Sequence, residues 1–116
     1  MAGLITIVGE LVLQPPANLC EAAATISLND TTMADAPAEI VATTRFNISG
    51  TQVVHVPFRL DIPAELPRNR RYTIAAEICR RPGRPAGLGN YLNMQSVPWF
   101  ADSPAPVQIP VRLIGR

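Results

Sequence analysis

The sequence predicts a single all-β domain, an antiparallel β-sandwich of seven to eight strands. Apolar residues alternate with polar ones along several short runs, as in half-buried strands. The 12 prolines and 7 glycines fall mainly between these runs, which is typical of short strands joined by fixed turns. A chain of 116 residues has the size of one domain, so residues 1–116 are assigned to one unit.

Four strands are predicted in the first half of the chain. Residues 4–13 form the first, and Gly9 within it indicates a bulge or a close backbone approach. Residues 14–19 are expected to be a loop, because their two prolines cannot donate to a strand ladder. Further strands follow at 21–28, 39–48 and 52–60, the last two separated by a turn at 49–51. Pro57 inside the fourth strand favours an edge or a bulge.

Three more strands are predicted in the second half. Residues 61–71 read as a loop, with one helical turn at 64–66. Residues 72–79 are the clearest strand, because four apolar side chains share one parity and are expected to face inward: Tyr72, Ile74, Ala76 and Ile78. A polar loop at 80–89 leads to strands at about 90–99 and 106–114.

The connection L-N-D-T-T-M-A-D-A-P-A at residues 28–38 is the stretch around which the strands are organised. Asp30 and Asp35 are expected to accept hydrogen bonds from their own downstream backbone, as in Asx turns. Pro37, after Ala36, fixes φ and forbids a long helix. We favour a structural role for these four residues over a binding role.

The two cysteines leave two alternatives open. Cys20 opens the strand at 21–28 and Cys79 closes the strand at 72–79, so a disulfide is possible if these strands are antiparallel neighbours. Their parities disagree, because Cys20 shares the inward parity of Ala22 whereas Cys79 follows inward Ile78. We therefore favour two buried or semi-buried thiols that behave as small apolar side chains.

A candidate partner surface combines aromatic and basic residues of the C-terminal third. Its members are Tyr91, Trp99, Phe100, Arg80, Arg81 and Arg84. Aromatic side chains of this kind serve either as anchors for a protein partner or as core residues. The arginines are alternatively solvated loop charges. The net charge of +1 favours neither a nucleic acid nor an anionic membrane as partner.

No motif in the sequence indicates catalysis, a cofactor or a metal site. His55 is the single histidine and is predicted to point outward, so that it makes no triad and no ligand set with the two cysteines. Phosphate-binding and zinc-binding motifs are absent. No apolar run approaches the ~20 residues of a membrane span, and residues 1–13 lack the basic start of a secretory signal. The chain is therefore expected to be cytosolic or to have lost a leader.

The motif I-S-L-N-D-T-T-M-A-D-A-P-A at residues 26–38 resembles the signature of the YscW/YbaY family, pilotin-like lipoprotein domains of Gram-negative bacteria. The runs V-P-F-x-L at 56–60 and R-Y-x-I-x-A-x-I at 71–78 resemble two further strands of that family. The resemblance spans about residues 8–114. It implies a compact β-sandwich in the periplasm or at the outer membrane that helps to localise and assemble a secretin ring. Cys20 does not follow an apolar leader and is not expected to carry the lipid anchor.

From these observations we expect a non-enzymatic accessory or chaperone-like domain that binds an envelope protein. A small-ligand or carbohydrate-binding sandwich is the alternative. It would use Tyr91, Trp99 and the arginine-rich loops, and it requires an aromatic-lined pocket. The sequence does not predict the oligomeric state.

Overall fold

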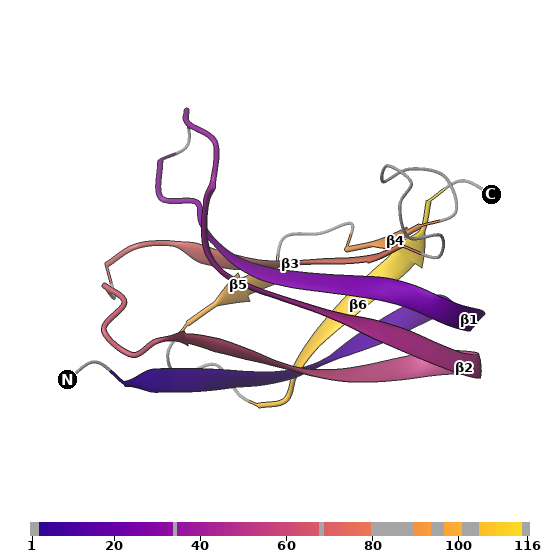
Figure 1. Ribbon diagram of the computed structural model, residues 1–116. Helices are drawn as coiled ribbons and strands as arrows, with labels where there is room; N and C mark the ends of the chain where they lie inside the picture. Colours follow the sequence, from indigo (N-terminus) through magenta and orange to yellow (C-terminus); the bar gives the residue numbers. More distant parts are fainter. Residues whose placement is uncertain are drawn as a thin grey trace.

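The computed structural model describes residues 3–33, 35–67, 69–79, 90–93, 97–100 and 105–114. These contain six strands: β1 (Leu4–Asp30), β2 (Glu39–Pro63), β3 (Tyr72–Cys79), β4 (Tyr91–Leu92), β5 (Val97–Trp99) and β6 (Val107–Leu113). The predicted all-β class is confirmed (Figure 1). A search of the described residues for a helix long and apolar enough to cross a membrane finds none.

Strands β1 and β2 form one long antiparallel hairpin, which takes up four of the predicted strands. Pairing runs from Leu4 opposite Pro63 to Asp30 opposite Glu39. The loop expected at 14–19 and the turn expected at 49–51 lie inside this hairpin, where the register shifts several times between Val12 and Ala22. Prolines cannot donate to a ladder, and the shifts accommodate them without ending the strand. The hairpin is thereby divided into two arms joined by a bend.

Side chains replace the ladder bonds that are lost at this bend. Glu21 and Gln52 have positive φ angles of 51° and 52°. The Glu21 N–H donates to Ser49 Oγ and the Gln52 N–H donates to Asn18 Oδ1, each at 2.9 Å. The irregular backbone also breaks the inside-outside alternation, so Cys20 is exposed and the predicted inward orientation of Cys20 is wrong.

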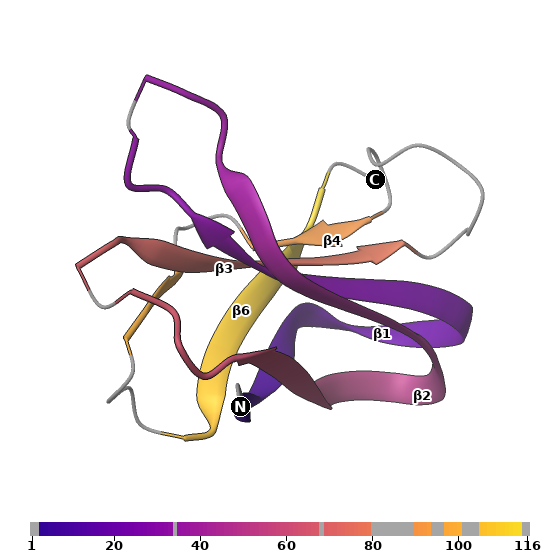
Figure 2. The ribbon, with the colours of Figure 1, turned by 60° about the vertical axis from the view of Figure 1, so that its left-hand side comes forward.

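The two arms of β1 pair with different strands and close a small barrel. The N-terminal arm pairs in parallel with β6, residues 9–14 against 107–112. The C-terminal arm pairs antiparallel with β3, residues 23–30 against 72–79. Because β4 pairs with both β3 and β6, strands β1, β6, β4 and β3 form a four-stranded mixed barrel, with β2 and β5 outside it (Figure 2).

This topology corrects the predicted sandwich of seven to eight antiparallel strands. The described residues form six strands, and one pair is parallel. There are fewer strands than predicted because pairing between β1 and β2 continues through the bend. The sheet closes because the bend places both arms of β1 against one core. The edge position of β2 agrees with the prediction from Pro57, which is exposed.

The strand predicted at 90–99 is divided into β4 and β5, which both pair with β3. Between them, the Asn93 side chain accepts the Ala76 N–H at 3.0 Å and donates to the Ile74 carbonyl at 3.2 Å. The helical turn expected at 64–66 is a simple turn at 64–65. The loop predicted at 80–89 lies outside the described residues.

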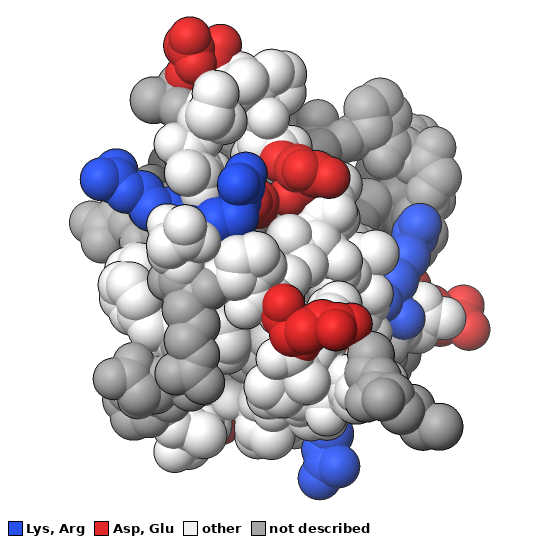
Figure 3. Space-filling view, turned by 90° about the vertical axis from the view of Figure 1, so that its left-hand side faces the viewer, with Lys and Arg blue, Asp and Glu red and all other residues white. Residues whose placement is uncertain are grey.

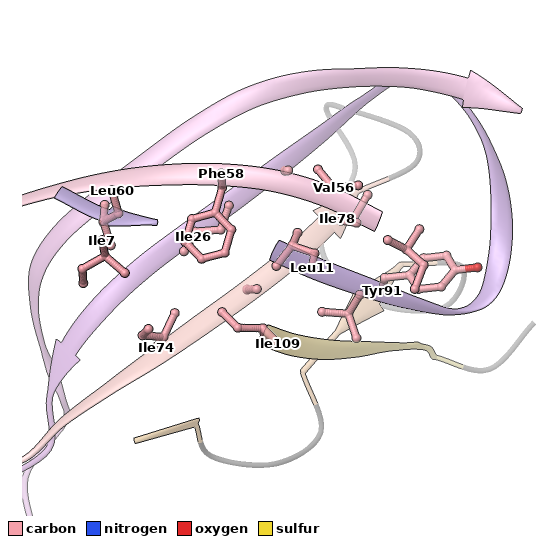
Figure 4. Close-up of a cluster of buried hydrophobic side chains, with 14 of the residues drawn as sticks. Ile7, Leu11, Ile26, Val56, Phe58, Leu60, Ile74, Ile78, Tyr91 and Ile109 are labelled. Carbon is pink, nitrogen blue, oxygen red and sulfur yellow. The ribbon is translucent and has the colours of Figure 1, made fainter. Parts of the chain in front are cut away.

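The core lies between the two arms of the hairpin and the strands that pair with them. The inward alternation predicted for β3 is confirmed, because Tyr72, Ile74, Ala76 and Ile78 are all buried. Figure 4 shows Phe58 and Leu60 of β2 among the buried isoleucines of β1, β3 and β6. The largest fully buried side chains are Leu11, Leu13, Ile26, Leu28, Leu60, Ile62, Ile74, Ile78, Tyr91, Ile109 and Val111.

Gly9 lies where three strands approach closely, as predicted. A Cβ atom at this position would lie 2.4 Å from Phe58 Cζ and 2.8 Å from the Val107 carbonyl oxygen. Gly9 pairs with Phe58 on one side and with Val107 on the other. The missing side chain therefore lets the Phe58 ring cover the strand.

Candidate functional site

An apolar groove runs along the hairpin beside the two halves of β2, and we call it the β2 groove. It has a volume of about 440 Å³ and is lined by Val8, Phe46, Pro57, Phe58 and Arg59. Val8 is 41% exposed, although it is apolar and lies on the outward side of its strand. The groove forms at the bend, because its lining combines Phe46 from the first half of β2 with residues 57–59 from the second half.

The β2 groove is mainly apolar. Four of its five lining residues are apolar, and Arg59 adds one charge. Exposed apolar area next to a packed aromatic ring favours the burial of apolar side chains from a partner. The arginine favours an acidic residue beside those side chains. Sequence reasoning missed this groove. Its signal was the set of apolar side chains, Leu4, Val8 and Val12, that share the outward face of residues 4–13 with Thr6 and Glu10.

A polar cluster ties the end of β1 to the segment that precedes β3. This Asp30 cluster consists of Asp30, Thr31, Thr32, Arg70 and Arg71. The Thr32 N–H donates to Asp30 Oδ1 at 2.9 Å, and Arg70 Nε donates to Asp30 Oδ2. The Arg71 N–H donates to Thr32 Oγ1, and the Thr31 N–H donates to the Arg71 carbonyl, both at 2.8 Å. The Asp30 side chain is only 8% exposed.

The cluster holds Asp30 in its ionised form. Hydrogen bonds from Thr32, and then the Arg70 guanidinium, lower the pKa of Asp30 to about 2. The same contact raises the pKa of Arg70. Figure 3 views this end of the molecule and shows acidic and basic side chains side by side below the protruding hairpin tip. An ion pair that is charged at neutral pH and held by several hydrogen bonds stabilises the connection between β1 and β3.

The remaining residues of the predicted signature lie at the hairpin tip, which projects beyond the barrel in both ribbon views (Figures 1 and 2). Asp35, Ala36 and Pro37 are exposed. The Ala36 N–H donates to the Met33 carbonyl at 3.3 Å. Within the described residues, the Asp35 carboxylate has no hydrogen-bond partner. Met33 is 60% exposed, so the tip presents an apolar side chain to solvent.

Two of the three aromatic members of the predicted partner surface are buried in the core. Tyr91 is buried and its hydroxyl donates to the Pro15 carbonyl at 2.7 Å. Trp99 is 9% exposed and packs edge to face on Tyr72, with ring centroids 6.4 Å apart. Phe100 is exposed, and the arginines Arg80, Arg81 and Arg84 lie outside the described residues. Tyr91 and Trp99 are core residues, the alternative given above, and they offer no stacking face to a carbohydrate.

The two cysteines are not joined by a disulfide. Cys79 lies opposite Ala23 of β1, further along that strand than Cys20. His55 points outward as predicted, and its Nδ1 lies 3.1 Å from the Glu10 carboxylate. The part of the chain that the structure describes contains no group of three or more His, Cys, Asp or Glu residues that could hold a metal ion.

Comparison with known proteins identifies the family. The model of the YscW family, described as a type III secretion system lipoprotein chaperone, matches residues 2–86, more than half of the chain. The fold is also similar to the structure of an alternative pilotin from the type II secretion system of Vibrio cholerae. The two share 26% sequence identity and a TM-score of 0.76, and the match covers 98% of each chain. No curated protein matches the sequence.

Both descriptions are those of non-enzymatic secretion-system proteins, in agreement with the prediction that this chain is not an enzyme. The protein is thus pilotin-like and lipoprotein-chaperone-like. On the family match over residues 2–86, the chain belongs to the YscW family of type III secretion system lipoprotein chaperones.

Proposed function

We propose that this protein binds a segment of a secretin subunit in the β2 groove and accompanies that subunit to the outer membrane. The observation that carries the proposal is the exposed apolar groove on a chain of a lipoprotein chaperone family. A chaperone of this kind must cover apolar surface of its client without chemistry, and the β2 groove has the composition for that task.

The groove is suited to a protein segment rather than to a small molecule. It is open and shallow, whereas pockets for small ligands bury most of the ligand surface. Val8 and Pro57 offer exposed apolar area on the outer side, and Phe58, buried in the core, fixes the strand beneath them. We expect the client segment to present apolar side chains to Val8 and Pro57 and an acidic side chain to Arg59.

The test compares two charge substitutions at exposed apolar positions, one inside the groove and one outside it. Val8→Glu places a carboxylate in the β2 groove, and Ile40→Glu places the same group near the hairpin tip, where Ile40 is 66% exposed. Titration calorimetry measures binding to purified fragments of the secretin from the same organism. We expect Val8→Glu to weaken binding by about tenfold or more and Ile40→Glu to bind like the wild type.

Two outcomes would contradict the proposal at different levels. Equal binding by the wild type and Val8→Glu would place the client outside the β2 groove. Absence of binding to every secretin fragment, together with unchanged secretin localisation in cells that lack the protein, would remove the chaperone role. Thermal unfolding of both variants checks that the substitutions leave the fold intact.

A further inference from the structure

A second pocket lies on the outer face of the barrel, where the C-terminal arm of β1 pairs with β3. We call it the β3 pocket. It has a volume of about 260 Å³, and its lining includes Thr25, Ser27, Ala75, Glu77, Leu92 and Asn93. It shares no lining residue with the β2 groove. Neither the family description nor the fold accounts for it.

The strand register explains why the pocket is present. Thr25 lies opposite Glu77 and Ser27 lies opposite Ala75, so small side chains occupy the centre of this face and leave it hollow. Asn93 forms one wall, and its side chain is fixed by two hydrogen bonds to the backbone of β3. The pocket is therefore preformed, and a ligand would not have to order it.

Glu77 supplies the unusual feature of the pocket. Its Oε2 atom is buried and has no hydrogen-bond partner in the portion of the chain that the structure describes. Buried carboxylate oxygens without a donor are costly and call for an explanation. Arg45 lies opposite Thr25 on β2, in the same cross-strand row. It is two strands away, roughly 10 Å by strand spacing, and it forms no ion pair with Glu77 among the described residues.

We propose that the β3 pocket receives a basic side chain, arginine or lysine, from a partner protein. The cationic group donates hydrogen bonds to Glu77 Oε2, and the aliphatic part of the side chain packs along Ala75 and Leu92. The open, shallow form of the pocket lets the backbone of a partner come close to the sheet. The inference rests on the proposed function only in that the partner is a protein, since it uses a separate surface.

The experiment is a titration of the full chain followed by the backbone amide resonances. The probes are N-acetyl-arginine amide and N-acetyl-citrulline amide, which have similar shape but differ in charge. We expect arginine to shift the amides of Thr25, Ser27, Ala75, Glu77 and Asn93 in a saturable manner. The citrulline probe should leave them in place. No saturable shift at these positions with the arginine probe would overturn the proposal.

Two variants sharpen the result. Glu77→Gln keeps the shape and removes the charge, and it should weaken arginine binding by about tenfold or more. Glu65→Gln, an exposed glutamate in the turn after β2, is the matched control and should bind like the wild type. Shifts that persist in Glu77→Gln would overturn the assignment. Saturable binding of spermidine in this pocket with no response to the arginine probe would overturn the choice of a protein side chain.

The pocket and the β2 groove can be tested independently. Val8→Glu should leave the response to the arginine probe unchanged, because Val8 does not line the β3 pocket. Loss of secretin binding in Val8→Glu without any arginine response in the wild type would refute the pocket and support the groove. An arginine response without secretin binding would support the pocket and count against the groove.

Discussion

Both arms of β1 are strands of the barrel, and each is reinforced by a further contact of a different physical kind. The C-terminal arm of β1 ends in the Asp30 cluster, where an ion pair and hydrogen bonds connect it to Arg70 and Arg71. The N-terminal arm is reinforced by packing, with the Phe58 ring lying over Gly9 beside β6. Polar attachment depends on protonation, whereas packing depends on volume. The arms should therefore respond to different perturbations.

Gly9→Ala should have the largest effect on stability, because it adds a methyl group where the N-terminal arm is tightly packed. The new methyl group would meet both the Phe58 ring and the Val107 carbonyl oxygen, and the backbone atom cannot rotate away. We expect the free energy of unfolding to fall by about 1–3 kcal/mol, the scale of overpacking, as measured by urea denaturation. Gly3→Ala is the control, because nothing lies within 4 Å of a Cβ atom there. Equal stability of the two variants would show that the N-terminal arm is not packed as described.

Asp30→Asn should remove the acid-dependent part of the stability that the Asp30 cluster gives to the folded protein through the C-terminal arm. The pKa of Asp30 is lowered from 3.8 to about 2 in the folded protein, so between these values the unfolded chain binds a proton that the folded chain does not. The stabilisation is complete above the unfolded pKa and is lost as the pH falls through the folded pKa. Wild-type stability should therefore decline over this window more steeply than that of Asp30→Asn.

Thermal melts at a series of acidic pH values measure this difference. Asp35→Asn is the matched control, because Asp35 is exposed at the hairpin tip, and this variant should keep the wild-type slope. Parallel pH profiles for the wild type and Asp30→Asn would argue against the Asp30 cluster as the acid-sensitive attachment.

Thr32→Val should have a moderate effect on the same arm. It removes the hydroxyl that accepts the Arg71 N–H at 2.8 Å and that also lowers the pKa of Asp30, and it leaves the Thr32 N–H bond to Asp30 in place. We expect a loss of about 1–2 kcal/mol, the scale of one or two hydrogen bonds, in denaturant unfolding. Thr51→Val, at an exposed position in the bend, should change stability much less, and a loss there as large as in Thr32→Val would remove the distinction.

Glu10→Gln should have the smallest effect, although it also alters a polar contact, with His55, between distant segments. His55 is 58% exposed in its side chain and Glu10 is 27% exposed, so solvent screens the contact. We expect a change below about 0.5 kcal/mol and little dependence on salt. A larger loss would mean that exposed pairs, and not only the Asp30 cluster, hold the hairpin together.

Short sequence patterns predicted those features of the fold that a few neighbouring residues determine. The period-two alternation of β3 gave its inward face, because a strand with one buried side must alternate. Gly9 predicted a close approach, because only that residue type leaves room for a neighbouring strand. The continuity of the hairpin was not predictable in this way, since it depends on Ser49 and Asn18 accepting bonds from residues on the opposite strand.

The candidate site depended even more on distant contacts. Tyr91 looked like a surface anchor, but its hydroxyl finds the Pro15 carbonyl 76 residues earlier in the chain. The β2 groove requires Val8 and Phe46 to meet across the bend, which no short window of sequence reveals. The Asp30 cluster was anticipated only on its β1 side, because Arg70 lies 40 residues further along.

The parallel pairing of β1 with β6 has a consequence for the synthesis of the protein. Glu10 and Gln108, which bond across the two strands, are 98 residues apart, and β6 follows the other five strands of the described residues. The closing contact therefore forms only after β6 has left the ribosome, and contacts of such long range form slowly. Until then the first strand has one edge open to pairing with other chains. The unclosed edge of the first strand is therefore the part of the nascent protein that is most exposed to aggregation.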